Sequence, residues 1–289
     1  MDRLQSRIRK TKNPLVVDFG MLEGDIPPQI LESQPSAASA WEFYGKALLD
    51  ALKEQTCAAR FSVNMAAVYG SDGMVALTEL LRYAKSLGYY VLLDGPAALS
   101  AQDAERASRV LFDSESSLQF DALVVSAYIG SDGIRPYAAR LAEYDKEMFV
   151  VLRTANRSAQ DLQDLRTGAR LVHTAAADIL GRFATEQGKS GYTRLGGVGA
   201  ANEANSLMTL RSKYKNMFIL VDGYEAAGSN AKICSNAFDR FGHGAAVCAG
   251  TDITAAWQNA PWTREDYIQA AKESADRIKK NLLRYVTIL

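Results

Sequence analysis

Short apolar runs alternate with longer amphipathic stretches along the whole of this chain. The runs occupy residues 15–19, 58–63, 89–94, 122–126, 148–153, 195–199, 217–222 and 244–249. Most of them lack an alternation of polar and apolar side chains, which is typical of parallel strands that helices cover on the outside. Eight such strands, separated by helical segments within 289 residues, predict a closed (β/α)8 barrel.

The stretches between the runs have helical periodicity and helical end signals. Residues 74–88 place their apolar side chains on one helical face and end at Gly88, a residue that commonly terminates helices. Residues 263–266 read Thr-Arg-Glu-Asp, which resembles a capping box and predicts the start of the last helix. The sequence therefore predicts one TIM-barrel domain over residues 1–289.

The sequence also leads to expectations for two less regular segments, and it leaves one alternative fold open. A helix is expected around residues 175–188, and residues 20–38 are expected to form a loop after the first strand. A doubly wound open sheet is the alternative to the barrel. No G-x-G-x-x-G motif follows the first strand, and this counts against a dinucleotide-binding fold.

Composition excludes several classes of protein. Lys plus Arg and Asp plus Glu both number 33, so the formal net charge is zero, which argues against a protein dedicated to nucleic acid or to a membrane surface. The three cysteines are far apart and form no C-x-x-C pair, so neither a disulfide framework nor a zinc site is predicted. No run of 18 apolar residues occurs, and a cytoplasmic location is expected.

Carboxylates follow several of the predicted strands, at the barrel end that usually carries the chemistry. These acids are Asp18, Asp94, Asp222, Glu225 and Asp252. Hard cations such as Mg²⁺ prefer oxygen ligands, so the acids are candidates for a cation site. The alternative is that they cap helices or pair with Arg60, Arg153 and Arg157. His173 and His243 lie away from these strand ends, so no histidine-based triad or metal site is predicted.

Five segments resemble the orotidine 5'-phosphate decarboxylase family, and in particular its longer bacterial branch. They are NPLVV at 13–17, VYGSDGMVALTELLRYAKSLGYYVLLDG at 68–95, DALVVSAYIGSDGIRPY at 121–137, VVLRTANRSAQDLQDL at 150–165 and FILVDGYEAAGSNAK at 218–232. The resemblance covers nearly the whole chain. It implies a TIM barrel, a homodimer with active sites near the interface, and decarboxylation of a pyrimidine nucleotide without a metal or cofactor.

The resemblance also implies a set of working residues, and few of them are present here. The family's Asp-x-Lys-x-x-Asp motif after the third strand falls on residues 94–99, where only Asp94 matches, since Pro96 and Leu99 stand at the Lys and second Asp positions. Arg60 stands where the family has a Lys, and Gly20 where it has an Asp.

The phosphate-binding positions are changed as well. The family's Gln and Arg fall at Ala227 and Thr251, so the strongest phosphate contacts are absent from this sequence. The loop after the fifth strand partly matches through Thr154 and Asn156. The ligand-binding candidates are therefore Ser126, Thr154, Asn156 and Tyr224.

The sequence leads to three hypotheses of function. The first is a non-catalytic relative, a pseudoenzyme with a structural, binding or regulatory role. The second is a divergent enzyme or a protein that binds a cation or small ligand through the acids at the barrel mouth. The third is a decarboxylase of pyrimidine nucleotide biosynthesis. A homodimer is the expected assembly, with a mixed dimer containing an active relative as the alternative.

Overall fold

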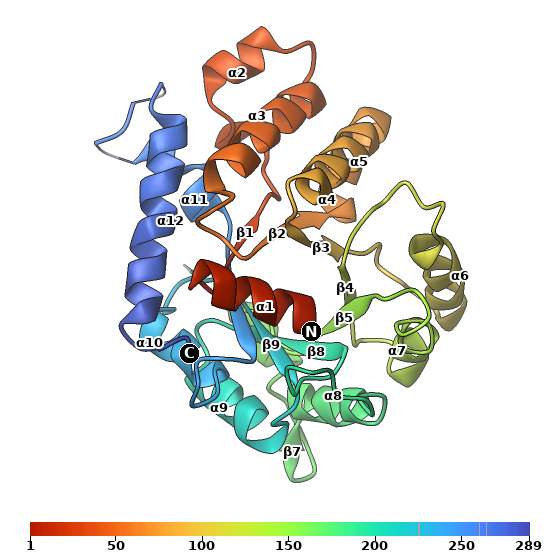
Figure 1. The fold of residues 1–289 in the computed structure, drawn as a ribbon. Helices are drawn as coiled ribbons and strands as arrows, with labels where there is room; N and C mark the ends of the chain where they lie inside the picture. The colour runs from red at the N-terminus through yellow and green to blue at the C-terminus, as the bar shows by residue number, and fades with distance from the viewer. Residues whose placement is uncertain (225, 260, 264) are drawn as a thin grey trace.

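The computed structural model describes residues 1–289 except Glu225, Ala260 and Arg264. Its barrel strands are β1 Leu15–Asp18, β2 Ala58–Ser62, β3 Tyr90–Asp94, β4 Ala122–Ser126, β5 Glu147–Val151, β8 Leu195–Ala200, β9 Phe218–Asp222 and β10 Ala245–Ala249. They pair in parallel, in the order β1-β10-β9-β8-β5-β4-β3-β2, and close into a barrel (Figure 1). The predicted (β/α)8 fold is confirmed, and each predicted strand lies within two residues of an observed one.

Helices surround this barrel because its strands expose apolar side chains on the outer as well as the inner face. They are α1 Asp2–Thr11, α2 Pro28–Ser33, α3 Ala37–Leu52, α4 Val63–Val68, α5 Gly70–Ser86, α6 Ala101–Phe112, α7 Ser131–Ala138, α8 Val172–Gly181, α9 Ala204–Lys213, α10 Ala231–Cys234, α11 Thr251–Thr254 and α12 Tyr267–Leu283. Gly88, with a φ of +79°, follows α5 as the sequence predicts. No helix of the described chain is long and apolar enough to cross a membrane.

Three sequence expectations need correction. The segment 20–38, expected as a loop, holds a short 3-10 helix at Glu23–Asp25, the helix α2 with Pro28 at its start, and the beginning of α3. The helix expected around 175–188 is α8, which starts earlier and ends at Gly181. The last helix begins only at Tyr267, because the Asp266 carboxylate accepts the Thr263 N–H and hydroxyl instead of capping the helix.

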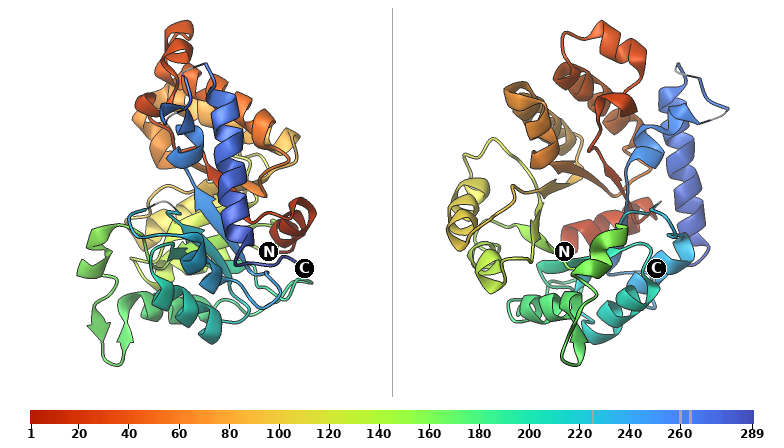
Figure 2. Two further views of the ribbon diagram at one scale, coloured as in Figure 1. Left: turned by 90° about the vertical axis from the view of Figure 1, so that its left-hand side faces the viewer. Right: turned by 180° about the vertical axis from the view of Figure 1, so that it is seen from behind.

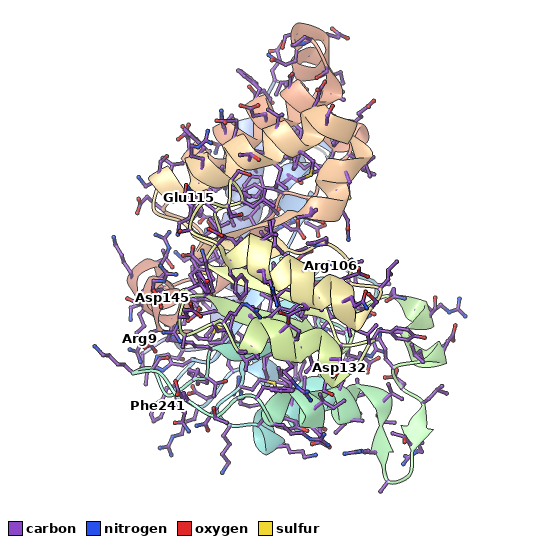
Figure 3. All side chains as sticks on the ribbon, turned by 90° about the vertical axis from the view of Figure 1, so that its right-hand side faces the viewer. Arg9, Arg106, Glu115, Asp132, Asp145 and Phe241 are labelled. Carbon is purple, nitrogen blue, oxygen red and sulfur yellow. The ribbon has the colours of Figure 1, made fainter. Side chains whose placement is uncertain are left out.

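The two ends of the barrel are covered differently. Helix α1 lies across the end where the strands begin, with the side chains of Arg9, Asp145 and Phe241 around it (Figures 1 and 3). The carboxyl ends of the strands form the opposite end, which we call the mouth. A hairpin of β6 Arg166–Thr167 and β7 Arg170–Leu171, which the sequence pattern did not predict, projects on that side, away from α1 (Figure 2).

Strand register brings the polar strand ends to one level. Asp18 pairs with Arg60 between β1 and β2, and Ser62 pairs with Asp94 between β2 and β3. On the other side of the barrel, Ala200 pairs with Asp222. The carboxylates that the sequence placed after separate strands therefore share one layer at the mouth.

Candidate functional site

Arg60 is the centre of the polar layer at the mouth. Its Nε and Nη2 donate to the two carboxylate oxygens of Asp94 at 2.9 and 2.8 Å, a two-point contact that holds the guanidinium plane. Its Nη1 donates to Asp222 at 2.7 Å and lies 3.5 Å from an oxygen of Asp18. The residue is 7% exposed, so one buried cation holds three strand-end carboxylates together.

The side chain of Arg60 can make these contacts because it rises from within β2 while its partners end three other strands. The same Nη1 lies 3.6 Å from the Cys248 sulfur in β10, so the guanidinium spans the barrel axis. The sequence showed no Lys, His or second acid next to Asp94 along the chain. In space, Asp94 has Arg60 bound to it and Asp222 bound to the same guanidinium.

The layer carries more negative than positive charge, and the pKa values respond to this. Burial is the main reason why the pKa of Asp18 rises to about 6; Asp94 and Asp222 add to the rise, and Arg60 opposes it. Burial also raises the pKa of Asp94, against the pull of Arg60. The acids, Asp222 first, raise the pKa of Arg60 despite its burial, so this cation cannot serve as a proton donor.

The acids that the sequence suggested as a cation site are arranged around Arg60 where the structure describes them. No group of three or more His, Cys, Asp or Glu residues in the described chain is arranged to hold a metal ion. The Asp18, Asp94 and Asp222 carboxylates are turned to Arg60, which takes the place that a cation would need. Asp252 is not part of that triad, and Glu225 lies outside the described residues.

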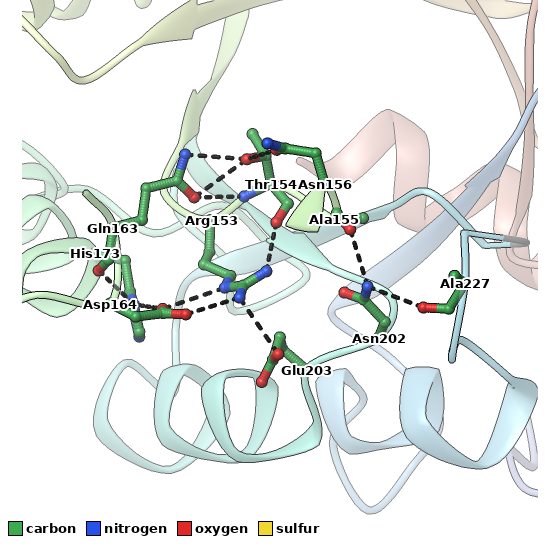
Figure 4. A network of polar contacts seen from close by, with 10 residues as sticks. All are labelled: Arg153, Thr154, Ala155, Asn156, Gln163, Asp164, His173, Asn202, Glu203 and Ala227. Atoms are coloured by element: carbon green, nitrogen blue, oxygen red, sulfur yellow. Dashed lines mark hydrogen bonds and ion pairs between the residues drawn. The ribbon is translucent and has the colours of Figure 1, made fainter. Parts of the chain in front are cut away.

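A second polar network lies beside the mouth and ties down the loop after β5 (Figure 4). Arg153, 4% exposed, donates to Asp164 at 2.8 Å, to Glu203 at 3.3 Å and to the Thr154 carbonyl at 2.5 Å. His173 Nδ1 lies 3.2 Å from the same Asp164. The hydrogen bond from Arg153 is the main reason why the pKa of Asp164 is lowered.

The ligand-binding candidates do not form one site. The Thr154 hydroxyl donates to Asn156 at 2.5 Å, and the Thr154 N–H donates to the Gln163 carboxamide oxygen at 2.8 Å, so both candidates belong to the second network (Figure 4). Ser126 is exposed at the end of β4, where its hydroxyl accepts the Tyr128 N–H. Tyr224 is buried and lines a cavity of about 360 Å³ together with Asn281 of α12 and Arg284, which follows that helix.

Sequence reasoning missed several members of these networks. Cys248, Gln163, Asp164 and Glu203 were not singled out. The signal for three of them was the concentration of polar residues after the fifth and sixth strands. Cys248 gave no signal, because it lies in an apolar run.

Five of the positions where the resemblance implies working residues carry no charged side chain, whereas Arg60 and Asp94 belong to the mouth layer. Pro96 and Leu99 are exposed in the loop after β3, and Ala227 and Thr251 are exposed after β9 and β10. Gly20 donates its backbone N–H to Asp18 at 2.9 Å. None of these five side chains supplies a cation or an acid to the mouth.

The chain is similar in sequence to known proteins that share one name. It is 28% identical over 265 residues to an orotidine 5'-phosphate decarboxylase of Clostridium acetobutylicum, covering 89% of this chain and 91% of that protein. It is 24% identical to the protein of the same name from Clostridium kluyveri, with 98% and 97% covered. No model of a protein family matches the chain.

Solved structures agree in fold. A putative orotidine 5'-phosphate decarboxylase of Streptomyces avermitilis superposes with a TM-score of 0.77 at 20% identity, covering 99% of this chain and 95% of that one. UMP synthase of Leishmania donovani gives 0.75 at 25% identity; the match covers 98% of this chain but 56% of that longer protein. The chain is thus similar, along nearly its whole length, to proteins named orotidine 5'-phosphate decarboxylase.

Proposed function

We propose that this barrel is a non-catalytic relative of the decarboxylases, with a binding or regulatory role. The observation that carries this proposal is the ion-paired layer at the mouth. Arg60 is held by Asp94, Asp222 and Asp18, so the one buried cation of the layer is already used inside the protein. The loop after β3, where the resemblance implies a proton-donating Lys, offers Pro96, which has no acidic or basic group.

Charge at the mouth also disfavours the substrate of the relatives. A nucleotide phosphate is held by backbone N–H groups and cations, and each charge-assisted hydrogen bond contributes about 1.5–3 kcal/mol. Here the three carboxylates outnumber the guanidinium, and Arg153 is bound to Asp164 and Glu203. A phosphate there would meet repulsion from these acids, and Arg60 and Arg153 are already ion-paired within the protein.

The second candidate is a working orotidine 5'-phosphate decarboxylase of pyrimidine nucleotide biosynthesis. Similarity supports it, because the two Clostridium relatives bear this name and match 89% and 98% of the chain. Taken alone, the comparisons favour this candidate over the non-catalytic one. Asp18, with its pKa raised to about 6, would be the group best placed to exchange a proton near neutral pH.

An activity assay separates the two candidates. The purified chain, made in a host that lacks its own decarboxylase, is expected to form no uridine 5'-phosphate from orotidine 5'-phosphate above the uncatalysed rate. Turnover that disappears in an Asp94→Asn variant would establish the decarboxylase instead, since a contaminating enzyme would not respond to that change. The double variant Pro96→Lys/Leu99→Asp is expected to remain inactive, because Ala227 and Thr251 still leave the phosphate unheld.

We further propose that two copies pair through the rim formed by the β2, β3 and β4 ends. Three large apolar side chains are exposed there: Val68 after β2, Leu99 after β3 and Tyr128 after β4. Exposed apolar groups that cluster on one rim favour burial against a partner. A second copy is the first choice of partner, and an active relative is the alternative.

Light scattering at micromolar concentration tests the pairing. The chain is expected to have the mass of a dimer, and Leu99→Asp is expected to shift it toward monomer. Val110→Asp is the matched control, because Val110 is similarly exposed but lies on α6, outside the rim. A monomeric wild-type chain would refute the homodimer, and co-purification of a mixed species with an active decarboxylase would support the alternative.

A further inference from the structure

A basic groove lies at the end of the barrel that α1 covers, opposite the mouth. It runs between α1 and the turn that joins α5 to β3, and encloses a cavity of about 490 Å³. Arg3, Arg7 and Lys10 line it from α1, and Lys85 lines it from the end of α5. Asp2 and Asp121 are the acids of its lining. Figure 1 shows α1 in front of the barrel end where this groove lies.

Both acids of the groove already have partners. The Asp121 side chain, 2% exposed as a residue, lies 2.7 Å from Arg3 Nη2 and 2.6 Å from Lys85 Nζ, and its second oxygen accepts the Val91 N–H. The Asp2 carboxylate accepts the N–H groups of Lys189 and Ser190 and the Ser190 hydroxyl. One buried carboxylate therefore faces two cations, and the other acid is turned to a loop.

The remaining cations of the groove are not matched by any carboxylate. Arg7 donates from Nε to the Cys57 carbonyl at 2.9 Å and from Nη1 to the Gly88 carbonyl at 2.6 Å, so it is fixed in place by neutral acceptors that leave its charge uncompensated. Lys10 is exposed and forms no hydrogen bond or ion pair with the residues that the structure describes. The groove thus holds surplus positive charge although the whole chain has none.

The surplus positive charge of the groove also affects the neighbouring Lys146. Burial is the main cause of its lowered pKa, and the like charges of Lys85 and Arg3 lower the pKa further, while Asp121 opposes them. Its ammonium donates to the Phe120 carbonyl at 2.6 Å. Two cations, Arg3 and Lys85, therefore contact the single Asp121 carboxylate, and Lys146 lies near enough to be affected by their charge. An added anion would relieve the repulsion among these cations.

We infer that this groove binds a small molecule through a phosphate or diphosphate group. A guanidinium and an ammonium, one pre-oriented and one free, match the oxygens of a multiply charged phosphate. The cavity volume falls in the range of small-molecule sites, about 300–1,000 Å³. The inference is independent of the function proposed for the mouth, since no residue of the mouth layer lines the groove.

A purely structural role explains only part of this arrangement. Basic residues in the last turn of a helix complement its dipole, and Arg9 and Lys10 occupy that position in α1. The ion pairs with Asp121 account for Arg3 and Lys85. Neither argument accounts for the charge of Arg7, whose carbonyl contacts would be made as well by a neutral donor. A ligand that carries the missing negative charge accounts for the uncompensated charge of Arg7 and Lys10.

Calorimetric titration with inorganic pyrophosphate, at low ionic strength, tests the inference. We expect saturable one-to-one binding, weaker binding of inorganic phosphate, and a dissociation constant raised about tenfold or more by Lys10→Glu. Arg7→Lys keeps the charge but loses the planar set of guanidinium N–H donors, and it is expected to weaken binding as well. Asp222→Asn at the mouth is expected to leave it unchanged.

Lys215→Glu is the matched control, because Lys215 is an exposed lysine outside the groove. If this control weakens binding as much as Lys10→Glu does, the protein attracts anions diffusely and the groove is not a site. Absence of saturable binding at millimolar pyrophosphate would also overturn the inference. Thermal melting of each variant is measured first, so that a loss of binding is assigned only to a folded protein.

Discussion

Replacing Arg60 with methionine is expected to lower the free energy of unfolding at pH 7.5 by about 3–5 kcal/mol. The substitution keeps the volume of the side chain roughly constant and removes the cation that the Asp18, Asp94 and Asp222 carboxylates share. It leaves Asp18, Asp94 and Asp222 facing one another without a counter-charge. Urea denaturation of the wild type and the variant measures the difference.

The loss is expected to shrink as the pH falls. Burial already raises the pKa values of Asp18 and Asp94, and Arg60 opposes this rise. Without Arg60 the two carboxylates keep the raised pKa values unopposed, so the folded variant binds more protons than the unfolded one. Stability that depends on such raised groups is present at low pH and is lost as the pH rises through the folded pKa values. The variant should therefore approach the wild type near pH 5 and differ most near pH 8.

Asp18→Asn is the control for this interpretation. Of the three carboxylates, Asp18 has the longest contact with Arg60, 3.5 Å, and its pKa is raised to about 6, so its ionised form lowers stability above that pH. We expect Asp18→Asn to be neutral or stabilising at pH 7.5, whereas Arg60→Met is destabilising. Equal destabilisation by both variants, or a loss in Arg60→Met that does not depend on pH, would contradict the charge argument.

Replacing Arg153 with methionine is expected to cost about 2–3 kcal/mol and to loosen the loop after β5. Arg153 is buried and holds Asp164, Glu203 and the Thr154 carbonyl (Figure 4). The expected loss is smaller than for Arg60, because Asp164 and Glu203 are partly exposed and regain water when released. Limited trypsin digestion reports the loop directly, since Arg157, Arg166 and Arg170 lie in it.

The loss in this second variant is also expected to shrink in acid, but for a different reason. The hydrogen bond from Arg153 is the main cause that lowers the pKa of Asp164, so the stability it contributes is present above the unfolded pKa and is lost as the pH falls through the folded one. The difference between wild type and Arg153→Met should therefore decrease in acid. Arg157→Met, at an exposed neighbouring position, is the control, and faster cleavage in both variants would argue against a specific role of Arg153.

The fold was predictable because its signal is local and repeated. Each barrel strand is a short apolar run, and such a run remains visible whatever surrounds it. The β6–β7 hairpin was not predictable, since its strands have two residues each, mostly exposed, and no apolar pattern. The helix α2 was missed because its single buried residue, Ile30, gives no periodicity.

The site was predictable only in its parts. Acids at strand ends are visible in the sequence, and so is Arg60 at the position where the resemblance implies a Lys. Their meeting depends on register, on the tilt of the strands and on the reach of one side chain across the barrel, none of which is local. The same limit applies to Arg153, whose partner Glu203 lies 50 residues away along the chain.

The guanidinium of Arg60 acts on the mouth as a tethered counter-ion. A group attached to its own site competes at an effective concentration of at least about millimolar, and a rigid attachment raises this value further. Free cations from the solvent therefore face a permanent competitor for the three carboxylates. Changes in the salt around the protein should therefore have little effect on which ions neutralise the three carboxylates at the mouth.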